Sequence, residues 1–279
     1  MRLLFFGTYS AFSSAALQTL LAANYPPVGV VLPQRPPAAL PQDFTSLPLF
    51  EPATPPNLVE LAHHHGLPLH FWRDDLPPAD LIVVACFPHR LPPRLLNHPT
   101  HAALNLHPSW LPFYRGPVPV FWQLRAGLTE LGVTVHYMDR DFDTGDIVAQ
   151  RTIPLPTGLT GSEIDVLLAT HGIHLLLPLL NPLSLPRTPQ PPNGTYQSWP
   201  QTSDWQVPLT WPVRHAFNFM RGVAEWGYPF FIHTPQRTYQ FSIAQHYEET
   251  PAVTPDEVRP AGDSWRLGFA DGWLWASSG

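Results

Sequence analysis

Short apolar runs alternate with segments of helical periodicity over the first 33 residues of the chain. RLLFFG ends in a glycine, AFSSAALQTLLAANY has apolar positions at helical spacing, and VGVVLP is a second apolar run. Apolar runs of this length that are bounded by turn residues are typical of buried strands, and the order strand, helix, strand favours a parallel sheet. The N-terminal segment therefore predicts a βαβ unit.

The same kind of pattern continues through the next part of the chain. DLIVVACF is apolar throughout, as expected for a strand in the centre of a parallel sheet. Strand patterns also occur in LPLHFW, HAALNLHP, GVTVHYM and IVAQRTIPL, and NLVELAHHHG has the pattern of a helix that ends at Gly66. We expect Ser162 to cap a last helix, which runs from about Glu163 to Leu180. These elements predict an α/β domain over residues 1–180.

The pattern changes in the last third of the chain. Residues 181–205 are rich in proline and predict a semi-rigid linker. Residues 206–279 begin with one helix and continue with the strand patterns PFFIHT, RTYQFSIAQHY and SWRLGF, and Asp271–Gly272 indicates a hairpin turn. One face of that helix is expected to carry Val213, Ala216, Phe217 and Met220. We expect residues 206–279 to form a small β-rich domain.

Composition narrows the classes of protein that remain. The formal charge of −6 argues against DNA and against broad nonspecific binding to nucleic acid, which needs a basic surface. All 15 basic residues are Arg. The single cysteine, Cys86, excludes an internal disulfide and a cysteine-based zinc site, and it suits a reducing cytoplasm. The apolar run after Arg2 is interrupted by polar residues at positions 7–10, unlike a signal peptide, and no stretch is long enough for a membrane span.

One strand ends in an unusual polar sequence. Side chains alternate along a strand, so Asn105 and His107 lie on one face, and Pro108 ends the strand at the open edge of the sheet. The loop DRDFDTGDI, which follows another strand, brings four aspartates to what could be the same edge. An amide, an imidazole and a carboxylate together can catalyse acyl transfer to an amine. The alternative is an ordinary polar strand end that the loop backbone satisfies.

The two blocks around these residues resemble a known family. NLHPSWLPFYRGPVPVFW followed by GVTVHYMDRDFDTGDIVAQ resembles the formyltransferases that use 10-formyltetrahydrofolate, whose pattern is Asn-x-His, Pro-Ser, Leu-Pro and Arg-Gly, then a strand leading to Asp-x-Gly. Both blocks occur in the right order and at the family's spacing. The resemblance covers nearly the whole chain. It implies a Rossmann-like open, parallel-rich sheet domain and a small C-terminal β-rich, barrel-like domain.

The resemblance also implies roles for individual residues. Asn105, His107 and Asp143 match the catalytic trio, in which the amide and the imidazole stabilise a tetrahedral oxyanion and the carboxylate orients the imidazole. The donor 10-formyltetrahydrofolate would lie between the segment 86–92 and the aspartate loop. Candidate donor-binding residues are Phe87, Arg90, Leu91, Pro92, Arg140 and Asp141. Candidates on the acceptor side are Tyr114, Arg115 and His136. No metal is implied.

The acceptor amine stays open in the sequence. Methionyl-tRNA and a small amine such as a nucleotide-linked amino sugar are both compatible with the resemblance. The loop PQRPPAALPQDF, where methionyl-tRNA formyltransferases carry several basic residues for tRNA, offers only Arg35, and His136 is closer to the pattern of the sugar enzymes. Two further alternatives are a hydrolase that releases formate from the same donor and a folate-binding protein without turnover.

Other motifs carry little weight. The chain has one Asp-Thr-Gly triplet at Asp143, whereas an aspartic protease needs two such loops to build its dyad. His63–His65 are consecutive on a predicted helix and do not share a face, so they do not predict a metal site. GTYS after the first strand lacks the glycine pattern of a dinucleotide site.

Overall fold

A computed structural model of the chain describes residues 1–34, 57–251, 253 and 257–278. Arg35 and the rest of the loop after the second strand lie outside the described residues. The chain divides into two compact units, which are described separately below. The first unit contains Met1–Pro119, Leu131–Ile153 and Asp165–Gln197. The second contains Val120–Glu130, Pro154–Ile164 and Ser198–Gly279. The domain boundaries at 180 and 205 stay a prediction.

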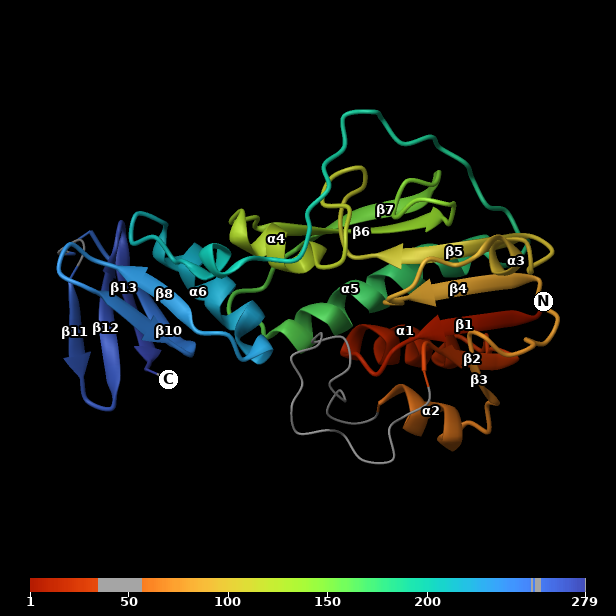
Figure 1. Cartoon of the computed structure of the whole chain (residues 1–279), viewed down its shortest axis with the longest axis horizontal. Helices are drawn as coiled ribbons and strands as arrows, with labels where there is room; N and C mark the ends of the chain where they lie inside the picture. The colour runs from red at the N-terminus through yellow and green to blue at the C-terminus, as the bar shows by residue number, and fades with distance from the viewer. Residues whose placement is uncertain (35–56, 252, 254–256, 279) are drawn as a thin grey trace. The chain divides into compact units, whose positions relative to one another are not determined.

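A seven-stranded sheet forms the centre of the first unit, in the order β3-β2-β1-β4-β5-β6-β7 (Figure 1). Its strands are β1 Leu3–Gly7, β2 Gly29–Leu32, β3 Leu69–Phe71, β4 Leu81–Ala85, β5 Ala102–His107, β6 Glu130–Tyr137 and β7 Ile147–Pro154. The pairs from β3 to β5 are parallel, and β6 runs antiparallel to β5. The predicted α/β fold with a parallel-rich sheet is confirmed.

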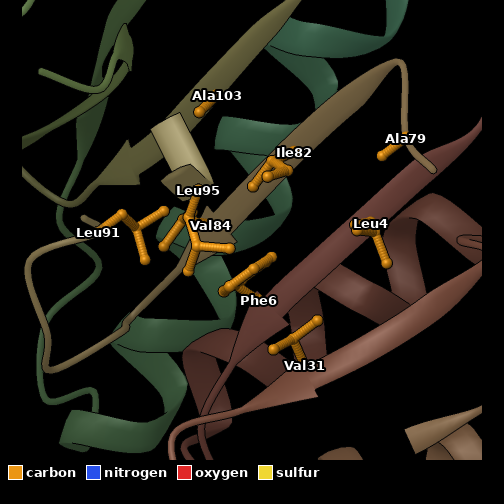
Figure 2. Packing of buried hydrophobic residues seen from close by; sticks show 9 residues of the cluster. All are labelled: Leu4, Phe6, Val31, Ala79, Ile82, Val84, Leu91, Leu95 and Ala103. Carbon is orange, nitrogen blue, oxygen red and sulfur yellow. The ribbon is translucent and has the colours of Figure 1, made fainter. Parts of the chain in front are cut away.

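Apolar side chains on both faces of the central strands explain why their sequences do not alternate. In β1, Leu4 and Phe6 point to one face and are fully buried, and Phe5, which points to the other face, is buried as well. Figure 2 shows the cluster on the first of these faces. The cluster consists of Leu4, Phe6, Val31, Ala79, Ile82, Val84, Leu91, Leu95 and Ala103. This packing fixes the strands whose ends carry the polar residues of interest.

The helices include the four that the sequence predicts and two short ones that it does not, Pro93–Leu96 and Pro119–Arg125. They are α1 Ala11–Ala22, α2 Leu58–His64, α3 Pro93–Leu96, α4 Pro119–Arg125, α5 Gly161–Leu176 and α6 Val213–Val223. The prediction that Ser162 caps α5 is wrong. The Thr160 hydroxyl accepts the N–H of Glu163, and Glu163 accepts the N–H of Thr160, whereas Ser162 lies inside the helix and donates to Glu225. No helix within the described residues is long and apolar enough to cross a bilayer.

The second unit is rich in β-structure, as the sequence predicts. A four-stranded antiparallel sheet has the order β10-β13-β12-β11, and β8 pairs with β9 in a separate hairpin. These strands are β8 Phe230–His233, β9 Thr238–Phe241, β10 Ile243–Glu249, β11 Val258–Ala261, β12 Ser264–Phe269 and β13 Gly272–Ser277. All four residues predicted for the apolar face of α6 are buried. The pattern RTYQFSIAQHY forms two strands, because Ser242 separates β9 from β10.

Candidate active site

Asn105 and His107 lie at the end of β5, and β6 places a second histidine beside them. The antiparallel register pairs Asn105 with His136 and His107 with Thr134. Side chains of directly opposed residues share one face of a sheet. Asn105, His107 and His136 therefore converge on one side of the sheet.

A hydrogen bond to His136 holds the Asn105 carboxamide. Nδ2 of Asn105 lies 3.1 Å from Nε2 of His136, and Nδ1 of His136 lies 2.8 Å from the carbonyl oxygen of Tyr137. Because a carbonyl only accepts, Nδ1 carries the proton and donates, which leaves Nε2 to accept from the Asn105 amide. Burial lowers the pKa of His136 to about 4, so the ring is neutral near pH 7. One N–H of the Asn105 amide remains available for a substrate oxygen.

His107 lies between the Tyr114 carbonyl and the carboxylate of Asp143. Nε2 of His107 donates to the Tyr114 carbonyl oxygen at 2.9 Å. Nδ1 is 3.5 Å from Oδ1 of Asp143, within ion-pair distance when the imidazole is protonated. The His107 side chain is 5% exposed and that of Asp143 is 10% exposed, so little solvent screens this pair. The two groups are placed to share a proton.

Two neighbouring segments fix the position of Asp143. The Gly116 N–H donates to Oδ2 of Asp143 at 2.9 Å. Asp143 itself has a φ of 58°, which is unusual for a residue with a side chain. Gly116 has a φ of 116°, and a Cβ there would collide with the Gln197 carbonyl oxygen, so only glycine fits. The glycine of the Arg-Gly pair thus allows a backbone donor to reach the carboxylate.

The three candidates on the acceptor side each make a hydrogen bond to another residue at the site. Tyr114 has a φ of 58° and provides the carbonyl that His107 donates to. The Arg115 guanidinium donates to Oε1 of Gln190 through Nε at 3.2 Å and Nη2 at 2.6 Å. His136 holds Asn105. These three residues therefore support the site, and a direct contact of any of them with an acceptor stays a prediction.

The candidate donor-binding residues divide into exposed and buried side chains. Arg90 lies 4.7 Å from the centre of the Phe142 ring and 3.9 Å from Asp141, and the Arg90 and Asp141 side chains are largely exposed. Leu91 is only 4% exposed and belongs to the core cluster, so its side chain anchors the segment after β4 in the core. Arg90 and Phe142 thus join the segment after β4 to the aspartate loop.

The other donor-side candidates are less constrained. Phe87 is partly buried and packs edge-on against Phe6, with ring centres 5.4 Å apart. Pro92 precedes α3. Arg140 is exposed in the aspartate loop. Asp139 stabilises this loop by accepting from the Asp141 N–H and from the Thr144 hydroxyl.

Three contributors to the site were not found from the sequence. Phe142 lies between two aspartates, and the signal for it in the sequence is an aromatic residue within a polar loop. The carbonyl of Tyr114 and the side chain of Gln190 have no signal in the sequence, because their roles depend on tertiary contacts. Gln190 lies in the segment that was predicted to be a linker.

Acid conditions are expected to destabilise the fold through His136. The pKa of this residue is about 4 in the folded chain and about 6.5 when unfolded, so the unfolded state binds more protons between these values. Stability therefore falls as the pH drops from about 6.5 to about 4, by on the order of 3 kcal/mol. In His136→Gln, urea unfolding should lose less stability over this range than in the wild type.

His89, His171 and His215 also have lowered pKa values because of burial, and they contribute equally to both proteins. The difference between the two pH slopes therefore isolates His136. Equal slopes would contradict the neutral, buried state of this ring.

Proteins of known family resemble this chain in sequence. A family model described as formyl transferase matches residues 75–177, which include Asn105, His107 and Asp143. The methionyl-tRNA formyltransferase of Syntrophus aciditrophicus (strain SB) is 32% identical over 273 residues, covering 92% of this chain and 83% of the relative. The methionyl-tRNA formyltransferase of Synechococcus sp. (strain JA-3-3Ab) is 34% identical over 239 residues, covering 79% of this chain and 71% of the relative.

Solved structures share the fold. The sugar 3N-formyl transferase WlaRD, crystallised in the presence of dTDP and 5-N-formyl-THF, has a TM-score of 0.66 at 15% identity, covering 100% of this chain and 97% of that one. The methionyl-tRNA formyltransferase from Clostridium thermocellum has a TM-score of 0.55 at 15% identity, covering 88% and 94%. The two relatives described above match at over 30% identity across more than two thirds of this chain and of their own length. This chain therefore belongs to the formyl transferase family.

Proposed function

We propose that this formyl transferase moves the formyl group of 10-formyltetrahydrofolate to a primary amine, with Asn105, His107 and Asp143 as catalytic residues. The observation that carries the proposal is the His107–Asp143 pair, at 3.5 Å, on the same side of the sheet as an Asn105 amide with a free N–H. Such a set can accept a proton and stabilise an oxyanion without a protein nucleophile.

In the proposed mechanism the acceptor nitrogen attacks the formyl carbon, and the carbonyl oxygen becomes an oxyanion. The remaining N–H of Asn105 donates to this oxygen, while His136 keeps the amide oriented. The His107–Asp143 pair takes the proton that the attacking nitrogen loses and returns it to N10 of the folate as the bond from carbon to N10 breaks. Nε2 of His107 is already used by Tyr114, so a second oxyanion contact from His107 requires the substrate oxygen to replace that carbonyl.

The residues around the aspartate loop suit the proposed donor. Folate combines a flat ring system with an anionic glutamate tail. Phe87 and Phe142 offer apolar rings, and Arg90 offers a largely exposed guanidinium for a carboxylate. Its separation of 3.9 Å from Asp141 is a weak ion pair between exposed groups, which a folate carboxylate can replace at little cost.

Methionyl-tRNA is the acceptor that we propose first, with the reaction in the cytoplasm. Two methionyl-tRNA formyltransferases match this chain at 32% and 34% identity over most of their length, and this is the specific support for tRNA. Phosphate contacts dominate the affinity of proteins for nucleic acid. Arginine, which supplies every basic residue of this chain, can form bidentate contacts with phosphate.

A small amine, such as a nucleotide-linked amino sugar, is the second candidate. The net charge of −6 favours it, because an acidic protein gains little from the long-range attraction that brings tRNA to a basic surface. The two candidates differ in their expected response to salt.

A panel of amines tests the proposed reaction and separates the acceptors. The protein is mixed with 10-formyltetrahydrofolate and, in separate reactions, methionyl-tRNA, deoxynucleotide-linked amino sugars or free methionine, and release of tetrahydrofolate is followed. We expect release that depends on the acceptor and is fastest with methionyl-tRNA. That activity should fall steeply as salt rises, whereas activity with an amino sugar should change little.

Release at the same rate without any amine would contradict formyl transfer and indicate hydrolysis of the donor. Release with an amino sugar but not with methionyl-tRNA would contradict the first acceptor and leave the reaction class intact. No release with any acceptor would contradict the proposed function as a whole.

A further inference from the structure

One glutamine side chain outside the predicted trio makes four hydrogen bonds at the site. Nε2 of Gln190 donates to the carbonyl oxygens of Asp143, at 2.9 Å, and Gly145, at 2.7 Å. Its Oε1 accepts from Nε and Nη2 of Arg115. Both donor hydrogens and the acceptor of the carboxamide are therefore used. Gln190 is only partly buried, yet each polar atom of its carboxamide has a partner within the protein.

The two carbonyls that Gln190 binds flank the turn that carries the carboxylate. Asp143 has a positive φ of 58°, a conformation that L-residues adopt only when their surroundings require it. Gly145 lies so close to the Tyr137 carbonyl that a Cβ there would collide with it. The Gln190 amide therefore holds this strained turn at two points, the carbonyls of Asp143 and Gly145.

The same glutamine also connects the other segment that holds the carboxylate. Arg115, which donates to Gln190, directly precedes Gly116, and the Gly116 N–H donates to Oδ2 of Asp143. The side chain of Gln190 thus connects the main chain of the turn at Asp143 to the Arg115–Gly116 segment, whose Gly116 N–H binds the Asp143 carboxylate. The contacts form a closed ring from Arg115 through Gln190 and Asp143 to Gly116.

We propose that Gln190 is a positioning residue for formyl transfer, which acts by holding the Asp143 carboxylate against His107. The inference rests on the proposed function of Asp143. Arg115 is the second positioning residue, since it orients the Gln190 amide so that Nε2 faces the turn at Asp143. A loss of either contact releases the turn at Asp143, and His107 then loses its partner at 3.5 Å.

A simple structural tether is the competing explanation, and other contacts already provide it. The Thr188 N–H donates to the Ile147 carbonyl, and the Ile147 N–H donates to the Thr188 carbonyl. The Thr195 and Gln197 N–H groups donate to Pro112 and Arg115 carbonyls. These bonds lie on both sides of Gln190 and hold the segment without it. Removing the Gln190 amide should therefore disturb the turn at Asp143 rather than detach the segment.

Gln190→Met tests the inference, because it keeps the length of the side chain and removes all four hydrogen bonds. We expect kcat to fall about 10- to 100-fold while KM for donor and acceptor stays within about threefold, and the melting temperature should change little. Gln190→Glu keeps the acceptor for Arg115 but loses both donors, so it should be no more active than Gln190→Met. Asn193→Asp, an exposed change to an acid on the same segment, is the matched control and should behave like the wild type.

A double mutant distinguishes positioning from a general structural effect. If Gln190 acts through Asp143, Gln190→Met should cause almost no further loss of kcat in an Asp143→Asn background. Additive losses would overturn the inference, and so would wild-type kcat in Gln190→Met.

A second measurement does not depend on activity. Gly116 N–H should exchange with solvent faster in Gln190→Met than in the wild type, because its acceptor on Asp143 is no longer held. Unchanged exchange would overturn the inference even if the wild type transfers no formyl group. An inactive wild type with faster exchange in the variant would instead reject the proposed function and leave the positioning of Asp143 intact.

Discussion

Asp143→Asn is expected to lower kcat by about 10²- to 10⁴-fold, the range typical for loss of acid–base catalysis, while donor affinity stays within a few-fold. The carboxylate lies 3.5 Å from Nδ1 of His107, and its side chain is only 10% exposed. An amide of the same shape keeps an acceptor for the Gly116 N–H but carries no charge and takes up no proton. Steady-state kinetics with the acceptor found in the amine panel, together with donor titration, measure both quantities.

Asp146→Asn provides the matched control for this variant. Asp146 lies three positions further along the chain and pairs with Arg187 at 3.5 Å rather than with a histidine. The same change of charge there should leave kcat within about twofold, because the pair is partly exposed, with side-chain exposures of 60% for Arg187 and 33% for Asp146. Loss of donor binding with little loss of turnover in Asp143→Asn would contradict the catalytic role of this carboxylate.

Asn105→Ala is expected to lower kcat by about 10²- to 10³-fold, as removal of a single oxyanion donor does in other enzymes. The effect should fall on kcat more than on KM, because the amide meets full negative charge only in the transition state. Truncation also removes the hydrogen bond to His136, which leaves the buried Nε2 without its amide donor. Chemical denaturation of the variant should therefore be measured beside its kinetics.

His136→Gln distinguishes the role of the Asn105 amide from the role of the residue that orients it. A glutamine at this position retains polar atoms that can hold the Asn105 amide, so its kcat should stay well above that of Asn105→Ala. If Asn105→Ala retained most of its activity, the proposed oxyanion contact would be wrong. If both variants lost activity equally, a glutamine at position 136 would not be able to orient the Asn105 amide.

The strands of the sheet could be predicted from the sequence because their burial determines the pattern of apolar residues. β1 and β4 read as continuous apolar runs since both faces of these strands are covered, and such runs are characteristic of central parallel strands. The placement of Asn105 and His107 on one face follows from the period of two along any strand. These inferences need only local spacing, and for that reason they could be made without coordinates.

The supports of the site could not be predicted in the same way. Gln190 acts on Asp143 and Arg115, which are distant in sequence, and no local pattern distinguishes it from other polar residues in a proline-rich segment. The need for glycine at position 116 arises from the Gln197 carbonyl, which folding brings beside it. The prediction for the cap of α5 was wrong because serine is the stronger capping residue in general, whereas Thr160 and Glu163 form the reciprocal contacts of a capping box.

The register between β5 and β6 has a consequence for how this sequence can change. Asn105 faces His136 because the two strands pair at that one offset, and side chains alternate along each strand. Inserting or deleting a single residue in either strand would turn one partner to the opposite side of the sheet. Length variation near the amide and its orienting histidine is therefore confined to the loops between strands.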